Sequence, residues 1–193
     1  MDFIKSKKFI LGTVSIVLIL VIVALGVWRY TYLNGKNPTP YKEAHGMNEY
    51  AVLGNFAIKA DKFEMLTLEE SKAIMSEQTF KVVSSTKGDA RILLITTTVR
   101  NISEIEDKLS ESSRFAVRSR AYAQGAIYVP IFFELNMGKQ YNLKLKPGEE
   151  ETIVIPCCIF SVSFSDKEWS CIDSRQFELS LSLNVVSKYI VLS

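Results

Sequence analysis

The sequence predicts an antiparallel β-sandwich that follows one N-terminal transmembrane helix. An uncharged apolar run, Phe9–Trp28, has the length of a membrane span. Behind it, about seven or eight short segments alternate apolar and polar residues, the pattern of strands with one buried face. Turn residues separate these segments, and strands at this spacing favour two sheets packed face to face.

The apolar run defines the expected order of the chain. Twenty residues of helix at about 1.5 Å each match a bilayer core of about 30 Å. We therefore predict a cytoplasmic basic tail over 1–8, the span over 9–28, an extracytoplasmic spacer over 29–47 and the sandwich over 48–193. The spacer is polar and its two prolines favour extended backbone.

The charges beside the span predict its direction. Lys5, Lys7 and Lys8 crowd the short N-terminal side, and basic residues beside a span tend to stay in the cytoplasm. The N-terminus is therefore expected inside and the domain outside, with Trp28 in the aromatic belt. The run is longer than the apolar part of a cleaved signal peptide, so we expect it to be retained, although Gly26 offers a peptidase a small residue.

Composition excludes several classes of function. The chain has 193 residues and a formal net charge of +2, and the basic tail accounts for that surplus. The remainder offers no excess of positive charge to a phosphate backbone, so no nucleic-acid partner is expected. No Gly-rich phosphate loop or zinc-binding spacing occurs, so no cofactor and no metal is expected.

The first half of the domain supplies one strand, one short helix and one turn region. Alternation over 55–60 predicts a strand that continues with Phe63 and Met65 after a bulge at Asp61-Lys62. Thr67 and Glu70 then have the spacing of a capping box, which predicts a short helix over 68–75. The residues around the following glycine are expected to form a turn.

The middle of the domain holds the best candidate for a central strand, 91–100, because it is rich in β-branched residues. Asn101–Ser103 ends it as a turn and also spells a glycosylation sequon. Strand character resumes over 115–122, where Arg118 and Arg120 would share one face. We expect that face to be solvated, because two arginines without a third donor rarely make an anion site.

The last part of the domain reads as further strands. The apolar run 127–135 predicts a strand that Pro130 places at an edge or a bulge. A long strand is expected over 152–164, followed by cleanly alternating residues over 177–185 and a final strand over 189–192.

The three cysteines are expected to be dispensable for stability. Neighbours on a strand point to opposite faces, so at most one of Cys157 and Cys158 can face Cys171. If a bridge forms, Cys158 with Cys171 is the candidate pair, and export would permit it. We predict instead that the domain is stable with free thiols, because Cys158 lies on an apolar face, where a free cysteine packs as a small hydrophobe. The expected face consists of Cys158, Phe160, Val162 and Phe164.

A family resemblance extends over most of the exported part. It rests on the order of the span, a strand ending in Val99-Arg100-Asn101-Ile102-Ser103, and a Leu145-Lys146-Pro147-Gly148-Glu149 turn leading into Thr152-Ile153-Val154-Ile155. This order resembles the immunoglobulin-like domains of unknown function on single-span membrane proteins and lipoproteins of Gram-positive bacteria. The resemblance implies an extracytoplasmic immunoglobulin-like sandwich and supplies no catalytic residues. The adjacent cysteines depart from its pattern.

The expected function is a membrane-anchored binding module without catalysis, whose partner is a protein or a cell-envelope component. One alternative is a sortase-like transpeptidase with Cys157 or Cys158 as nucleophile, His45 as base and Arg175 at the oxyanion. The threonine-rich approach to the sortase cysteine is missing, and His45 lies far from both cysteines in sequence. The other alternative is an accessory subunit of a membrane or envelope assembly, in which the helix makes the specific contact.

Overall fold

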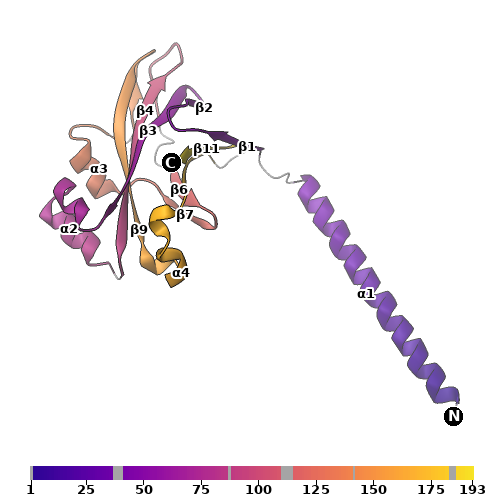
Figure 1. Cartoon of the computed structure of the whole chain (residues 1–193). Coiled ribbons are helices and arrows are strands. Elements are labelled where there is room, and N and C mark those ends of the chain that lie inside the picture. The colour runs from indigo at the N-terminus through magenta and orange to yellow at the C-terminus, as the bar shows by residue number, and fades with distance from the viewer. Residues whose placement is uncertain (1, 37–40, 87, 110–114, 141, 183–185) are drawn as a thin grey trace. The chain divides into compact units, whose positions relative to one another are not determined.

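The computed structural model describes residues 2–36, 41–86, 88–109, 115–140, 142–182 and 186–193. The chain forms two compact units, Met1–Pro40 and Tyr41–Ser193. The first unit holds one long helix, α1 (Asp2–Lys36), which extends beyond the predicted span at both ends (Figure 1). Among the described residues, no helix combines the length and the apolarity needed to cross a membrane.

The second unit is built from two main sheets and one small strand pair. The five-stranded sheet has the order β1 (Tyr41–His45), β11 (Val186–Leu192), β10 (Phe177–Ser182), β6 (Ala116–Ser119) and β7 (Tyr122–Gly125). The four-stranded sheet has the order β2 (Ala51–Leu53), β3 (Phe56–Thr67), β4 (Ala90–Asn101) and β9 (Glu150–Phe160). The small pair joins β5 (Asp107–Lys108) to β8 (Lys144–Leu145).

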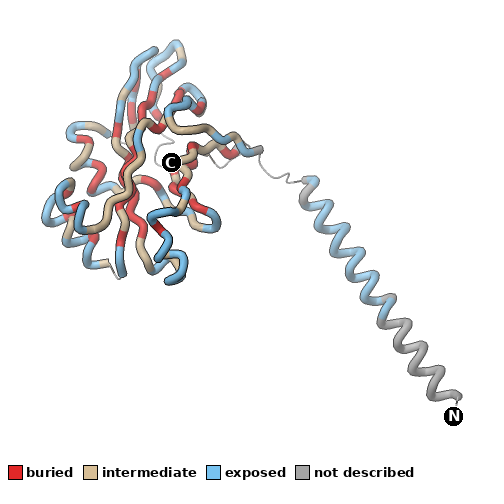
Figure 2. Tube along the Cα trace, viewed as in Figure 1, coloured by how far each residue is buried: buried red, intermediate tan, exposed pale blue. Residues whose placement is uncertain are grey.

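The two main sheets bury one shared core, which confirms the predicted sandwich. Leu93 and Ile95 of β4 are fully buried in the same cluster as Phe177 and Leu179 of β10. Phe63 of β3 adds a ring contact of 6.4 Å, centroid to centroid, with Phe177 across the sheets. Figure 2 shows this buried layer running along the facing strands. Strand β4 is central, as predicted, because it pairs with both β3 and β9.

Three helices of the described chain cover the outer face of the four-stranded sheet, and the sequence predicted only the first of them. They are η1 (Glu70–Ile74), α2 (Glu77–Ser84) and α3 (Val129–Leu135). Ile92, Leu94 and Cys158 are buried in a second apolar cluster with residues of these helices. Figure 1 shows α2 and α3 on one side of the long strands. Both faces of β4 and β9 are therefore buried, and the domain has three layers.

Two local predictions in this region are confirmed. The register between β3 and β4 shifts between Ala60 and Lys62, which places a bulge at Asp61. The extra residue returns Phe63 to the core face after Ala60. Further on, Glu70 Oε2 accepts the Thr67 N–H at 2.8 Å and Thr67 Oγ1 accepts the Glu70 N–H at 3.2 Å, the two bonds of a capping box. The helix that follows is a 3₁₀ helix, η1.

The predicted strand over 127–135 is wrong, since most of that segment is helix α3. Pro130 lies in its first turn, where a missing N–H costs nothing and the fixed φ suits a helix. The short apolar run fits a strand or a buried helix equally well, and packing against the second cluster decided between them.

The predicted strand over 152–164 is correct only in its first part. β9 ends at Phe160, and the next residues form the 3₁₀ helix η3 (Ser161–Ser163). Val162 is consequently 62% exposed and does not continue the apolar face of Cys158. In the predicted strand over 177–185, β10 covers the first six residues, and residues 183–185 lie outside those described.

The predicted spacer also contains a strand. β1 pairs in parallel with β11, the one parallel pairing among the described strands, and the compact domain begins at Tyr41 rather than at residue 48. His45 Nε2 lies 2.8 Å from Glu43 Oε1, and Lys188 Nζ of β11 lies 3.2 Å from Glu43 Oε2. Part of the predicted spacer therefore forms the edge strand of the five-stranded sheet.

Candidate functional site

Two adjoining hollows lie between the β6–β7 hairpin and the segment that contains η3, α4 (Asp166–Trp169) and η4 (Ile172–Ser174). The first, here called the arginine hollow, has a volume of about 440 Å³ and is lined by Arg120, Lys167, Glu168, Cys171, Ser174 and Arg175. The second has about 410 Å³ and adds Ala121, Tyr122, Ala123, Ser163 and Phe164 to the same Glu168 and Arg175. The Glu168–Arg175 pair thus separates two parts of one concave surface.

The local sequence builds the α4 side of the hollows through a capping box. Ser165 Oγ accepts the Glu168 N–H at 3.3 Å, and Glu168 Oε2 accepts the Ser165 N–H at 3.2 Å. The Ser165 bonds, from side chain and backbone, together with Arg175, hold the pKa of Glu168 below its usual range. Glu168 is therefore a fixed carboxylate, with its other oxygen 3.5 Å from Arg175 Nη1.

Arg175, which lines both hollows, is held in place by hydrogen bonds to Ser119. Its Nε donates to Ser119 Oγ at 2.8 Å, and its Nη2 donates to the Ser119 carbonyl at 3.0 Å. The guanidinium carbon lies 5.1 Å from the centroid of the Phe164 ring. The side chain is only 9% exposed, so its position is fixed before any ligand arrives.

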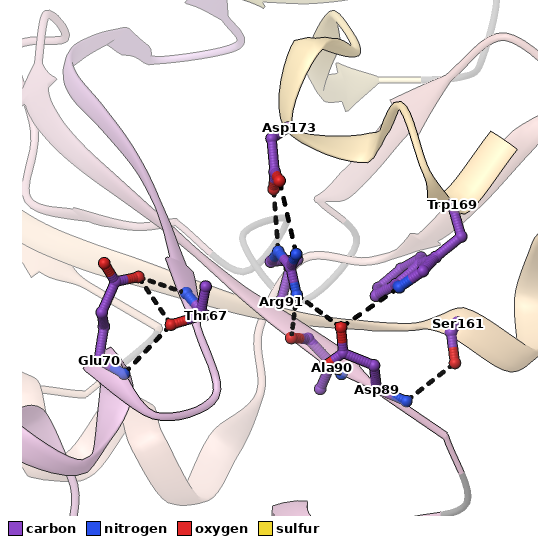
Figure 3. Close-up of polar contacts among 8 residues, drawn as sticks. All are labelled: Thr67, Glu70, Asp89, Ala90, Arg91, Ser161, Trp169 and Asp173. Carbon is purple, nitrogen blue, oxygen red and sulfur yellow. Dashed lines mark hydrogen bonds and ion pairs between the residues drawn. The ribbon is translucent and has the colours of Figure 1, made fainter.

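A second arginine, Arg91 of β4, contacts both α4 and η4 and so holds this segment against β4 (Figure 3). Its Nε donates to Asp173 Oδ1 at 2.9 Å and its Nη1 to Asp89 Oδ2 at 2.8 Å. Its guanidinium lies 5.5 Å from the centroid of the Trp169 ring, and Trp169 Nε1 donates to Asp89 Oδ2 at 3.3 Å. Asp173 is thereby ion-paired with Arg91.

One glycine brings the start of β4 against this segment. Gly88 has φ +99°, and a Cβ there would lie 2.3 Å from Ser161 Oγ. The neighbouring Asp89 N–H donates to the same Ser161 Oγ at 2.9 Å, as Figure 3 shows. A side chain at position 88 would therefore collide with the Ser161 hydroxyl, which already accepts the Asp89 N–H.

Arg120 reaches the arginine hollow from a strained turn. The β6–β7 hairpin pairs Ser119 with Tyr122, which leaves a two-residue loop whose first residue is Arg120 with φ +51°. Glycine is the usual residue in that conformation. The predicted shared face of Arg118 and Arg120 is wrong, because β6 ends at Ser119 and Arg118 stays in the sheet, opposite Glu178.

The structure separates the residues of the sortase-like alternative. Cys157 and Cys158 are buried, and burial raises the pKa of both thiols, that of Cys158 to about 12. A buried neutral thiol is a poor nucleophile. The described bonds of His45 run to Glu43 of its own strand and reach neither cysteine.

The structure contains Cys157, Cys158 and Cys171 as free cysteines, with Cys171 exposed in the arginine hollow. Cys158 faces the helical layer and Cys157 the core between the sheets. The candidate pair Cys158–Cys171 is therefore not bonded in the structure. The side chains of the predicted topology signal and anchor start, Lys5, Lys7, Lys8 and Phe9, lie outside those described.

Sequence reasoning missed the hollow as a site. It weighed Arg118 with Arg120 and named Arg175 only as an oxyanion partner. Glu168 and Ser165 do carry a local signal, since their spacing is that of a capping box. No short-range pattern in the sequence indicates that α4 lies beside the β6–β7 hairpin, which precedes it by some 45 residues. Only the tertiary fold brings the two together.

No protein-family model and no curated protein matches the chain. Solved structures of uncharacterized proteins from Gram-positive bacteria are similar to it. The yjhA protein from Bacillus subtilis has 15% identity and a TM-score of 0.46, over 77% of this chain and 99% of that one. A conserved hypothetical protein from Bacillus anthracis has 12% identity and a TM-score of 0.46, over 70% and 87%. An uncharacterized β-sandwich protein from Clostridium difficile has 11% identity and a TM-score of 0.46, over 80% and 96%.

Proposed function

We propose that this chain is a membrane-tethered binding module: α1 anchors an immunoglobulin-like sandwich that binds a protein or cell-envelope partner and performs no catalysis. The observation that carries the proposal is the uncovered apolar surface of α1. The large apolar and aromatic side chains described between Ile16 and Leu33 are 44% to 68% exposed. A continuous apolar surface of this size needs a cover of lipid or protein.

The sequence supports a lipid cover. The apolar run Phe9–Trp28 begins before the described side chains and contains no charged residue. Its length suits a bilayer, and the rings of Trp28 and Tyr32 stack with centroids 5.9 Å apart, in the region expected for the interface. The lysines before the run favour a cytoplasmic N-terminus, which would put the sandwich outside the membrane.

The binding role is supported by the concave surface of the sandwich. The arginine hollow gathers several polar side chains, of which Arg175 and Glu168 are held in place by hydrogen bonds, and a few positioned polar groups in a concave surface are typical of ligand sites. The non-catalytic part of the proposal is supported by the burial of Cys157 and Cys158. A variant with both changed to serine should keep its partner binding, whereas a transpeptidase would lose its activity.

Protease treatment of intact protoplasts tests the topology. The sandwich should be digested from outside, while a cytoplasmic marker protein in the same cells stays intact. Digestion that occurs only after lysis would contradict the proposed orientation. Recovery of the chain in the soluble fraction after lysis would contradict the anchor itself.

The exposed surface of α1 also favours the accessory-subunit alternative, because another membrane helix could cover it. Replacing residues 9–28 by an unrelated transmembrane sequence separates the two functions. A binding module should keep its partners in cross-linking experiments on intact cells. Loss of those partners would show instead that the helix makes the specific contact.

A further inference from the structure

We propose that the arginine hollow binds a phosphate group carried on a small organic body, of the kind found in envelope polymers and lipid headgroups. The inference rests on the proposed function, which would put the domain beside the outer surface of the membrane. It goes further by naming the chemical class of ligand.

The charges that line the hollow favour an anion. Arg120 of the β6–β7 loop, Lys167 of α4 and Arg175 after η4 bring three positive charges, against the one carboxylate of Glu168. Neither Arg120 nor Lys167 has an ion-pair partner among the described residues. Two arginines alone rarely make an anion site, but here the fold brings Lys167 and Arg175 beside Arg120, so that three cationic side chains line the hollow.

Arg175 is prepared to donate to a ligand oxygen. Its Nε and Nη2 are occupied by Ser119, which fixes the plane of the guanidinium. Its Nη1 has only a long contact of 3.5 Å with Glu168 Oε1. An oxyanion in the hollow would offer Nη1 a shorter, charge-assisted bond, and a guanidinium fork suits the oxygens of phosphate.

Arg120 provides an independent indication. A residue with a side chain is strained at φ +51°, and strain that persists at a functional residue is often part of its role. In this turn it projects a cation at the rim of the hollow, where glycine would give the same backbone without strain.

The dimensions fit more than a bare ion. A volume of about 440 Å³ lies in the usual range for small-molecule sites. The adjoining hollow of about 410 Å³ shares Glu168 and Arg175 with the first and gives room for the organic part of the ligand. We therefore expect a phosphate ester to bind more tightly than inorganic phosphate.

The test is calorimetric titration of the full chain in phosphatidylcholine nanodiscs. The probes are inorganic phosphate, glycerol 3-phosphate, neutral glycerol and the dicarboxylate glutarate. Glycerol 3-phosphate should bind saturably and more tightly than phosphate or glutarate, and glycerol should not bind. Arg120→Gly and Lys167→Gln should each weaken its binding about tenfold, the effect of one lost charge-assisted bond.

Arg118→Gln is the matched control, because it removes the neighbouring arginine, which does not line the hollow. It should leave the affinity within about twofold, because Arg118 lies in the sheet opposite Glu178 and, without a direct bond to the ligand, its charge is largely screened by salt. Arg120→Gly relieves the strained turn, so its melting temperature should not fall, and a loss of binding by this variant cannot be attributed to unfolding.

Nanodiscs that also contain phosphatidylglycerol identify the source of the phosphate. If an anionic lipid headgroup occupies the hollow, glycerol 3-phosphate will bind the unchanged protein more weakly in these discs than in discs of phosphatidylcholine alone, whose headgroup has no net charge. If the ligand is a soluble or polymer-borne phosphate, its affinity will be equal in both discs. Each result is compatible with a phosphate site.

The inference is overturned if glycerol 3-phosphate does not bind saturably, if glutarate binds equally well, or if both hollow variants behave like Arg118→Gln. These failures are distinct from failure of the proposed function. Protease accessibility on protoplasts and membrane fractionation do not depend on the hollow, so a tethered binding module would stand with a different ligand.

Discussion

Replacing Asn101 by alanine should destabilise the domain strongly, although the residue stands in a turn-like sequence at the end of β4. Asn101 is completely buried. Its Nδ2 donates to the carbonyls of Ile105 and Leu145, each at 2.8 Å. Its Oδ1 accepts the N–H of Ser103 at 2.9 Å and the Ser103 hydroxyl at 2.8 Å. One side chain thus joins the end of β4 to the next loop and to β8.

The loss of unfolding free energy in Asn101→Ala can be estimated from these four hydrogen bonds. At about 1 kcal/mol each they amount to about 4 kcal/mol, and water can recover part of this near the exposed Ile105, which leaves about 3 kcal/mol. For a domain of this size that corresponds to a fall in melting temperature of roughly 6–12 °C. Asn101→Asp should be at least as harmful at neutral pH, because it turns two donors into acceptors that face carbonyls.

The assay is chemical and thermal unfolding of the Tyr41–Ser193 unit, followed by circular dichroism. Asn55→Ala is the matched control, because that asparagine makes one exposed bond, to Asp107 at 2.7 Å, and its loss should change the stability little. A change below about 1 kcal/mol for Asn101→Ala would refute the reasoning, since a typical single bond is worth that much. The same burial predicts that the sequon at Asn101 carries no glycan in the folded protein.

Three further predictions concern the backbone, the thiols and pH. Gly88→Ala should unfold at clearly lower denaturant than Gly138→Ala, because both glycines have positive φ but only position 88 also meets a hydroxyl; equal losses would refute the clash. Cys171 should react with Ellman's reagent in the native protein and the two cysteines of β9 only after unfolding, with a midpoint unchanged by reductant; one free thiol in denaturant would show a bridge. Burial raises the pKa of Glu134, but hydrogen bonds from Ser76 and Thr79 outweigh it, so the pKa in the folded domain lies below that in the unfolded chain. The stability that this carboxylate contributes is therefore fully present above its unfolded-state pKa and is lost as the pH falls through its folded-state pKa. Glu134→Gln should therefore make stability less dependent on pH below about 4.5 than in the unchanged protein, and identical acid profiles would contradict this.

The sequence determined the features that depend on local pattern. Alternation of apolar residues predicted β4 and the start of β3, because period two leaves one face for a core. The spacing of Thr67 and Glu70 predicted a capping box, because its two bonds lie within four residues. The bulge at Asp61 was predictable because only an extra residue returns the next apolar side chain to the same face.

Tertiary structure decided what local pattern leaves open. The apolar segment 129–135 is a helix because it packs, beside η1 and α2, on the apolar outer face of the four-stranded sheet. Residues 41–45 became a strand because the edge of β11 offered backbone partners. The arginine hollow arises only where a hairpin and a distant helix meet, so Arg120 and Arg175 could not be joined from the sequence. Short-range periodicity fixes which faces are apolar, whereas long-range packing determines what covers them.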